Sequence, residues 1–464
     1  MKNKISRLYN WLFDNLSVPK ILSISFLFVI FVGTILLSLP ISNLTKDVTL
    51  LDHLFTATTS TCVTGLLTVT VKNQYTLFGK FIIMCMIQIG GLGLMTVISV
   101  VLLFTNAKLN FKERLLLKDA LNKMDFSSIS QYVKSIFKFT FVFELIGAFV
   151  YFLAFYFMEG IPFIESIGHA IFLSISAFCN AGIDCFGSTS LLNFQTNPII
   201  ILNTSFLIII GGIGFAVWFD YYYQLRMLYR LRNKVYALRS KLKIHTKLVT
   251  YLTLVLIFGG MFIILILEYN NSLVHLSLFD KIVNAFFNSV TLRTAGFFTI
   301  DYSILHRVTK VIMIGFMLVG GSPGGTAGGI KTTTFFLLIY AVYNEFNQKE
   351  RLHIFNRHIK KSNFIKAYTI FGIYLLFIII TWLIMLCIES YDGIDLLYEI
   401  VSAIATVGLT IGITSSLSTL GKLIIIFLMF IGRVGPITIL YSIAGDSKNN
   451  DNALKYPSTE IIVG

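Results

Sequence analysis

Residues 406–410 read Thr-Val-Gly-Leu-Thr, between two long apolar runs and directly after a short segment of helical character at 395–405. A helix, a glycine-containing loop and a return to apolar sequence are typical of a re-entrant element, which enters and leaves a membrane on the same side. Irregular backbone at that depth is tolerated only where it is buried in protein or lines a wet cavity. Because carbonyl oxygens in such a loop can replace the hydration shell of a cation, we interpret this stretch as a candidate ion-selective loop.

The same design occurs three more times in the chain. The related stretches are Thr61-Cys62-Val63-Thr64-Gly65-Leu66, Phe178-Cys179-Asn180-Ala181-Gly182-Ile183 and Leu292-Arg293-Thr294-Ala295-Gly296-Phe297. Successive glycines are separated by 117, 114 and 112 residues, and each is followed 24 to 29 residues later by a second glycine motif, beginning at Gly90, Gly211, Gly320 and Gly432. This period is far longer than a solenoid repeat, so we interpret it as four copies of one membrane unit.

Composition restricts the class of protein. With 56% hydrophobic residues, 13% charged residues and a mean hydropathy of +0.80, the chain is an integral membrane protein rather than a set of soluble domains. The net charge of +14 does not indicate nucleic acid, because the basic residues cluster in connectors between apolar runs. Residues 221–247 hold eight Lys or Arg and no acidic residue, which marks a cytoplasmic loop that contacts membrane lipids.

We predict an all-α polytopic membrane protein with eight transmembrane helices, arranged as four span–pore-loop–span repeats around a central pore with pseudo-fourfold symmetry. The expected spans are 21–39, 77–104, 137–157, 198–219, 248–267, 311–343 (a broken helix), 367–388 and 423–443. The repeats, called units 1 to 4, are 21–110, 111–225, 226–350 and 351–445. We expect a cytoplasmic amphipathic N-terminus at 1–20 and a cytoplasmic tail at 446–464.

The four glycine loops (63–66, 180–183, 294–297 and 406–409) are predicted to meet at one selectivity filter. The expected ion-binding residues are Val63, Thr64, Gly65, Asn180, Ala181, Gly182, Thr294, Ala295, Gly296, Thr406, Val407 and Gly408. Neutral carbonyl ligands suit a monovalent cation that must both enter and leave, and these loops hold no Asp or Glu. Acidic residues elsewhere, including Asp52, Asp184, Asp395 and Glu399, either attract cations to an external mouth or are ordinary loop charges.

The third follower motif departs from the others. Its residues are Gly320, Gly321, Ser322, Pro323, Gly324, Gly325, Thr326, Ala327, Gly328, Gly329, Ile330 and Lys331. So many glycines and a proline cannot continue a helix. We expect loop 320–334 to lie in the bilayer beneath the filter, as a gate or as a simple hinge. A phosphate-binding loop is rejected, because Ile330 replaces the required glycine and no strand precedes it.

Two arginines lie within apolar sequence. Arg433, in Gly-Arg-Val-Gly, is expected to face the pore beside loop 320–334, as an electrostatic barrier or as a clamp on loop carbonyls. Arg293 is expected to point away from the pore axis and to pair with a carboxylate behind the filter. A direct role for Arg293 in repelling ions is the alternative.

At these residues the chain resembles the Trk/Ktr/HKT superfamily of potassium transporters, and most of all its KtrB-like membrane subunits. The resemblance rests on the four loops, on Gly-Gly-Ser-Pro-Gly-Gly-Thr-Ala-Gly-Gly-Ile-Lys-Thr-Thr, and on Gly-Arg-Val-Gly-Pro. It implies potassium uptake in a bacterial cell membrane, with K+ as the transported ion and Na+ as an activator. It also implies a homodimer and a cytoplasmic nucleotide-binding regulatory ring of RCK type. By position it assigns the filter to Gly65, Gly182, Gly296 and Gly408, and the gate to loop 320–334 and Arg433.

An alternating-access secondary transporter of a small cation or solute is the alternative function. That class tends to use inverted repeats, whereas these four units run in parallel. An enzyme is not expected, since the sequence offers no nucleophile, metal cluster or paired carboxylates.

Overall fold

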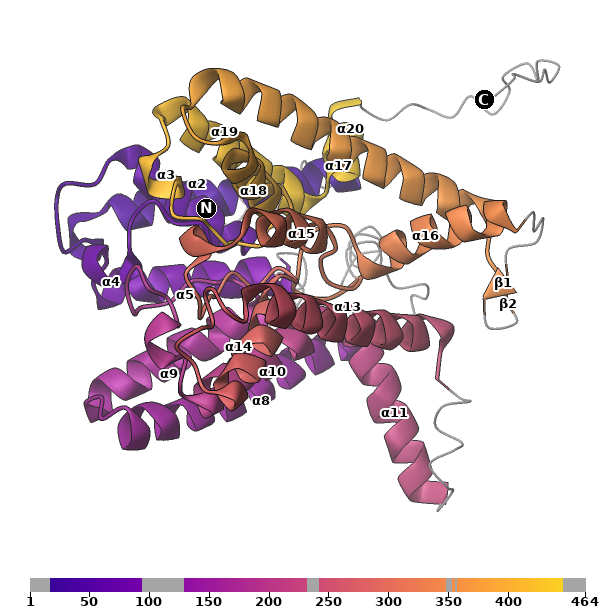
Figure 1. The fold of residues 1–464 in the computed structure, drawn as a ribbon, viewed down its shortest axis with the longest axis horizontal. Coiled ribbons are helices and arrows are strands. Elements are labelled where there is room, and N and C mark those ends of the chain that lie inside the picture. Colours follow the sequence, from indigo (N-terminus) through magenta and orange to yellow (C-terminus); the bar gives the residue numbers. More distant parts are fainter. Residues whose placement is uncertain (1–16, 94–128, 232–241, 348–352, 355–356, 445–464) are drawn as a thin grey trace, which may run out of the picture.

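The computed structural model describes residues 17–93, 129–231, 242–347, 353–354 and 357–444 (Figure 1). Most of the expected amphipathic N-terminus, the tail at 446–464 and much of the basic connectors lie outside these ranges.

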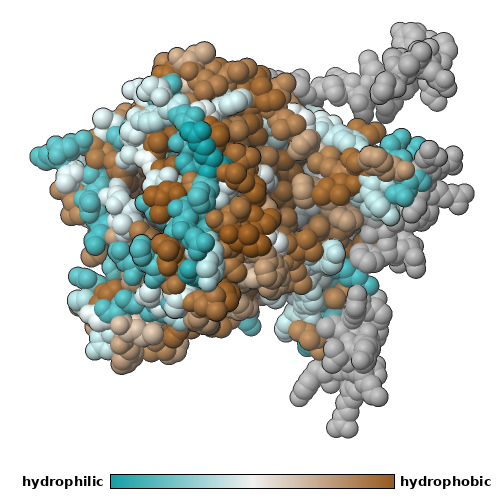
Figure 2. All heavy atoms as spheres, in the orientation of Figure 1, coloured by the Kyte–Doolittle hydropathy of each residue, from teal (hydrophilic) through white to brown (hydrophobic). Residues whose placement is uncertain are grey.

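Each unit begins with a long apolar helix. These helices are α2 (Val18–Ser38), α8 (Ile129–Leu153, which continues as the π-helix η2, Ala154–Met158), α13 (Ile244–Glu268) and α17 (Lys361–Ile388). Within the described residues they are the four helices long and apolar enough to cross a membrane, with mean hydropathies of 2.0 to 2.7. They expose large apolar side chains such as Phe28, Phe149 and Leu376, and Figure 2 shows broad hydrophobic areas on the viewed face. The protein is therefore a multi-pass membrane protein.

A short helix follows in every unit and leads into the glycine loop. The short helices are α3 (Leu50–Cys62), α9 (Phe163–Cys179), α14 (Leu278–Thr291) and α18 (Gly393–Ile404). Side-chain caps fix the start of two of them. Thr49 forms a capping box with Asp52, and the hydroxyl of Ser277 accepts a hydrogen bond from the backbone amide of Asp280. All four end beside the loops, in surroundings that bury even their Thr, Ser and Asn side chains.

The second helix is interrupted in units 2, 3 and 4, and in unit 1 its described part ends at Leu92. The segments are α5 (Leu77–Leu92), α10 (Pro198–Ile213) with α11 (Phe215–Leu231), α15 (Arg307–Leu318) with α16 (Thr332–Phe346), and α19 (Thr419–Val434) with α20 (Pro436–Ala444). The chain bends by 95° between α10 and α11 and by 93° between α19 and α20. The expected spans at 198–219 and 423–443 are therefore each broken by a bend that the sequence analysis did not predict. If each bent pair is one span, up to six candidate spans lie within the described residues.

The cause of these breaks is the last glycine of each follower motif. Gly93, Gly214 and Gly435 have φ angles of +82°, +98° and +96°, which a helix cannot contain. The first glycine of the same motif serves close packing: a side chain at Gly90, Gly211 or Gly432 would overlap the carbonyl oxygen four residues before the loop glycine of its unit. In unit 3 the whole segment between α15 and α16 is a loop instead.

Short elements join the rest of the chain. They are α4 (Val71–Gln74), the 3-10 helices η1 (Pro40–Ser42), η3 (Leu192–Phe194), η4 (Tyr302–Ile304) and η5 (Thr414–Ser416), and the strands β1 (His353–Ile354) and β2 (Arg357–His358). The strands pair antiparallel, with His353 opposite His358.

The units pack in a closed order. The second helix of each unit lies against the short helix of the next: α5 on α9, α10 on α14, α15 on α18, and α19 on α3. Ion pairs hold two of these contacts. Lys310 Nζ lies 2.9 Å from Asp395 Oδ1, and Lys422 Nζ lies 3.2 Å from Asp52 Oδ1. Because unit 4 contacts unit 1, the four short helices surround one centre.

The pair between units 4 and 1 yields a stability prediction. Its side chains are only 17% and 12% exposed, so removal of one partner leaves the other charge largely shielded from water. We expect Lys422→Met to lower the free energy of unfolding by about 1 to 3 kcal/mol, between the values for exposed and buried pairs. Thermal unfolding in detergent measures this, with the exposed Lys46→Met as the matched control. Equal melting temperatures for both variants would contradict it.

Candidate functional site

The four loop glycines meet at one place. A methyl group added to Gly65 would lie 3.2 Å from the Cα atoms of both Gly182 and Gly408, and one added to Gly182 would lie 2.6 Å from Cα of Gly296. One added to Gly408 would overlap the carbonyl oxygen of Thr64. The glycines are required here because four backbones approach one another more closely than side chains allow.

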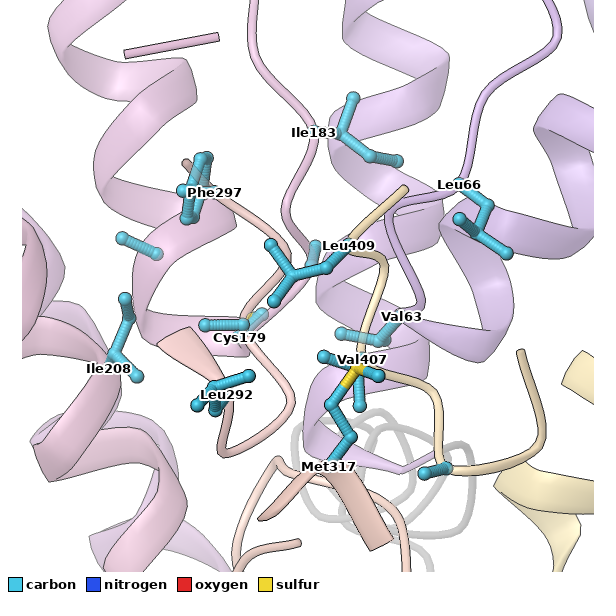
Figure 3. Close-up of a cluster of buried hydrophobic side chains, with 14 of the residues drawn as sticks. Val63, Leu66, Cys179, Ile183, Ile208, Leu292, Phe297, Met317, Val407 and Leu409 are labelled. Carbon is cyan, nitrogen blue, oxygen red and sulfur yellow. The ribbon is translucent and has the colours of Figure 1, made fainter. Parts of the chain in front are cut away.

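Side chains behind the glycines lock this arrangement. The residue after each glycine is a large apolar one and is fully buried: Leu66, Ile183, Phe297 and Leu409. Figure 3 shows these four side chains, from four separate loops, in one hydrophobic cluster. These side chains are buried in protein, while the glycine backbones approach one another.

All four loops repeat one backbone conformation. Two residues before each glycine the chain is left-handed, with φ of 56° at Val63, 60° at Asn180, 67° at Thr294 and 52° at Thr406. Each loop glycine also has a positive φ, from 66° to 108°. Non-glycine residues rarely adopt this conformation, and its cost of about 1 to 3 kcal/mol is typical of functional sites.

The amide between the two left-handed residues donates to the short helix of its own unit. The N–H of Thr64 donates to the carbonyl of Thr59 (2.9 Å), and that of Val407 to the carbonyl of Ser402 (2.8 Å). Ala181 and Ala295 do the same at 2.8 and 3.0 Å. No hydrogen bond within the described part of the chain ends on the carbonyls of these four residues or of the loop glycines. Those oxygens are available to a ligand.

Electrostatics at the centre favour a cation. The short helices α3, α9, α14 and α18 end at the loops, so the partial negative charge of four helix C-termini is directed there. With no full negative charge in the loops, the attraction is weak enough to permit release.

The acidic residues near the loops are bound into the protein. Glu399 accepts hydrogen bonds from Thr410, from Thr414 (2.9 Å) and from the amide of Ile411 (3.2 Å). Asp184 accepts from the amide of Phe186 (2.9 Å), and burial raises the pKa of Asp184 to about 6. Asp52 and Asp395 form ion pairs, so all four carboxylates bind other parts of the protein. These contacts favour ordinary loop charges over charges that attract cations to an external mouth.

The predicted loop 320–334 is irregular only as far as Lys331, because Thr332 begins α16. Its backbone hydrogen bonds connect it to itself and to unit 2. At its neck, the amide of Gly320 donates to the carbonyl of Ile330 (3.0 Å). Farther out, the amides of Ser322 and Thr326 donate to the carbonyls of Gly212 (3.0 Å) and Gly211 (3.1 Å). The break between α10 and α11 also contributes, because the amide of Phe215 donates to the carbonyl of Gly324 (3.1 Å).

Arg433 lies beside this loop and binds carbonyl oxygens. Its Nη1 donates to the carbonyl of Thr326 (2.5 Å), and its Nη2 donates to the carbonyls of Gly90 and Gly91. These contacts are those of the clamp. Arg433 also lines a cavity of about 590 Å³ together with Lys331 and Lys366, and none of the described residues that line it is Asp or Glu.

The carboxylate partner expected for Arg293 is not found among the described residues. Only Lys310–Asp395 and Lys422–Asp52 form ion pairs within the described residues, so Arg293 has no carboxylate partner there. It is 6% exposed, and its Nε and Nη2 atoms have no hydrogen-bond partner. Arg293 occupies the position of Cys62, Cys179 and Ala405 in the other loops, three residues before the glycine. That position faces apolar neighbours such as Ile257 and Val290 rather than an acidic group.

A multi-pass fold whose four equivalent loops direct carbonyls and helix C-termini to one centre defines a membrane cation transporter. The chain belongs to the TrkH family, described as cation transport protein, whose family model matches residues 5–452. This confirms the resemblance drawn from the motifs, and the homologues are ion transporters rather than enzymes.

Relatives match over nearly the whole chain. It is 38% identical to the Ktr system potassium uptake protein B of Bacillus subtilis, over 96% of both proteins. It is 36% identical to the potassium/sodium uptake protein NtpJ of Enterococcus hirae, over 97% of this chain and 98% of that protein. The crystal structure of the potassium transporter TrkH from Vibrio parahaemolyticus shares the fold, with a TM-score of 0.68 and 17% identity over 90% of this chain and 84% of that one.

Proposed function

We propose that this protein takes up potassium ions across the bacterial cell membrane through a gated pore lined by main-chain carbonyls. The observation that carries the proposal is the meeting of Gly65, Gly182, Gly296 and Gly408 with unbonded carbonyls around them. In this proposal K+ is held by the oxygens of residues 63–65, 180–182, 294–296 and 406–408. The names of the two relatives above include potassium, and the name of NtpJ also includes sodium.

The proposed topology has eight membrane crossings. The four long helices supply one crossing per unit, and the interrupted second helices supply the others. Basic connectors such as 221–247 then lie in the cytoplasm with both termini. We further propose a homodimer and a cytoplasmic nucleotide-binding regulatory ring of RCK type, since the Ktr relatives are named as parts of a system.

The proposed gate is loop 320–334 with Arg433. The loop fills the interruption of the second helix in unit 3, and Arg433 binds its carbonyl at Thr326. Positive charge from Arg433 and Lys331 at the cavity opposes a cation until the loop moves. Sodium is proposed as an activator of this transport.

Flux into liposomes tests the proposed function. The purified protein is reconstituted with internal K+, diluted into low external K+, and given tracer rubidium. A pore accumulates tracer because its own K+ gradient sets the membrane potential, and a protonophore that collapses this potential should abolish accumulation. Tracer uptake that is the same with and without the membrane potential would instead support alternating access. Added external Na+ is expected to raise the initial rate, and an unchanged rate would remove the sodium role.

A further inference from the structure

The gating loop makes direct contact with the underside of the glycine loops. Oγ1 of Thr326 lies 3.2 Å from the carbonyl oxygen of Phe178 and 3.2 Å from Oδ1 of Asn180, and can donate to either. The amide of Gly328 donates to Oγ1 of Thr294 (3.3 Å). All of these residues are buried, so water does not substitute for the contacts.

These contacts fall on the left-handed residues. Asn180 and Thr294 are two of the four non-glycine residues with positive φ in the glycine loops. The third, Thr406, is approached so closely by the loop that a methyl group added to Gly328 would overlap its Oγ1. Strained backbone of this kind persists only where its surroundings hold it.

Residue type follows contact with the gating loop. The left-handed residue is polar in units 2, 3 and 4, where loop 320–334 touches it. In unit 1 it is the apolar Val63, which lies against Gly90 of its own unit, as Asn180 and Thr406 lie against Gly211 and Gly432. No contact between Val63 and loop 320–334 is seen among the described residues. Plain space-filling would not require a polar side chain at three of four equivalent positions.

We propose that loop 320–334, through Thr326 and Gly328, is a positioning element for the selectivity filter, so that ion preference depends on the position of the gate. This inference rests on the proposed function. With the loop in place, hydrogen bonds hold Asn180 and Thr294 in the conformation that directs the neighbouring carbonyls inward. When the loop moves, those bonds break, the carbonyl ring relaxes, and discrimination between K+ and Na+ falls. Gate and filter therefore act as one device.

Thr326→Val tests the proposal, because it keeps the shape of the side chain and removes the hydroxyl. The matched control is Thr204→Val, which removes an equally buried hydroxyl that bonds Tyr151 on the first helix of unit 2 (2.6 Å). The readout is the K+/Na+ permeability ratio from reversal potentials in reconstituted bilayers. We expect Thr326→Val to lower this ratio by about fivefold, as for loss of one net hydrogen bond. Thr326→Ser and the control should keep the wild-type ratio.

A changed conductance or open probability with an unchanged ratio in Thr326→Val would overturn the proposal, since the loop would then only block the path. That result would leave the proposed function intact. The proposed function would be contradicted by a different result, namely that the wild-type protein conducts no K+.

A measurement on the wild-type protein keeps the proposal testable if Thr326→Val does not fold. Coupling between two sites is reciprocal, so the ion in the filter must influence the loop. We expect hydrogen exchange at the amides of Thr326 and Gly328 to be slower in KCl than in NaCl of equal ionic strength. Identical exchange rates in the two salts would overturn the proposal.

Discussion

Gly408→Ala is expected to abolish potassium uptake. The new methyl group would overlap the carbonyl oxygen of Thr64, and it would lie only 2.8 Å from Cα of Gly65. Residue 408 also has a φ of +89°, which alanine adopts only with strain. Both effects push the loops of units 4 and 1 apart. Since each 1.4 kcal/mol lost at a binding site is a factor of ten, we expect uptake to fall by about a hundredfold or more.

Gly168→Ala is the matched control. Gly168 lies within the short helix α9, and a methyl group added there meets nothing within 4 Å. This variant should transport at the wild-type rate. Growth of an uptake-deficient bacterium at low potassium compares the two, with membrane expression measured by immunoblot. Normal growth with Gly408→Ala would exclude a filter at the four glycines.

Arg433→Ala is expected to raise the basal potassium flux by about tenfold. The change removes a positive charge from the cavity, and it releases the carbonyl of Thr326 together with those of Gly90 and Gly91. An interaction of about 1.4 kcal/mol at an effective dielectric constant near 20 accounts for a factor of that size. Tracer uptake into liposomes without regulatory protein measures it.

Arg433→Gln separates the barrier from the clamp. Glutamine is neutral but can still donate to a loop carbonyl, so a pure barrier predicts the same flux as Arg433→Ala, and a clamp predicts a flux nearer to wild type. The control is Arg226→Ala, on the exposed part of α11. Unchanged or lower flux in folded Arg433→Ala protein would contradict both roles.

The meeting of the loops could be predicted from sequence because the four glycines recur at regular intervals with their follower motifs. Four like units in one chain have few ways to pack, and the closed order of α3, α9, α14 and α18 follows from one contact repeated four times. The approach of Arg433 to loop 320–334 could also be predicted from the sequence, because a guanidinium within an apolar helix requires oxygen atoms nearby.

Other features were missed by the sequence analysis. The expected spans were placed from hydropathy, which depends on residue type and carries no information on the backbone angle φ. The bends at Gly214 and Gly435 were therefore missed. Their signal was present, since a glycine recurs at the same place in three follower motifs. The partner of Arg293 was inferred from a general rule and not from any acidic residue nearby. The bond from Thr326 to Asn180 joins unit 3 to unit 2, and only tertiary packing discloses it.

The order in which the units pack has a consequence for biosynthesis. Because α19 lies against α3, units 1 and 4 are neighbours, and Lys422 can meet Asp52 only after unit 4 has been synthesised. A nascent chain that lacks unit 4 leaves one side of the ring of short helices without its neighbour. On the proposed function, ion conduction therefore requires unit 4, and a product that ends before α19 lacks the contact that closes the ring.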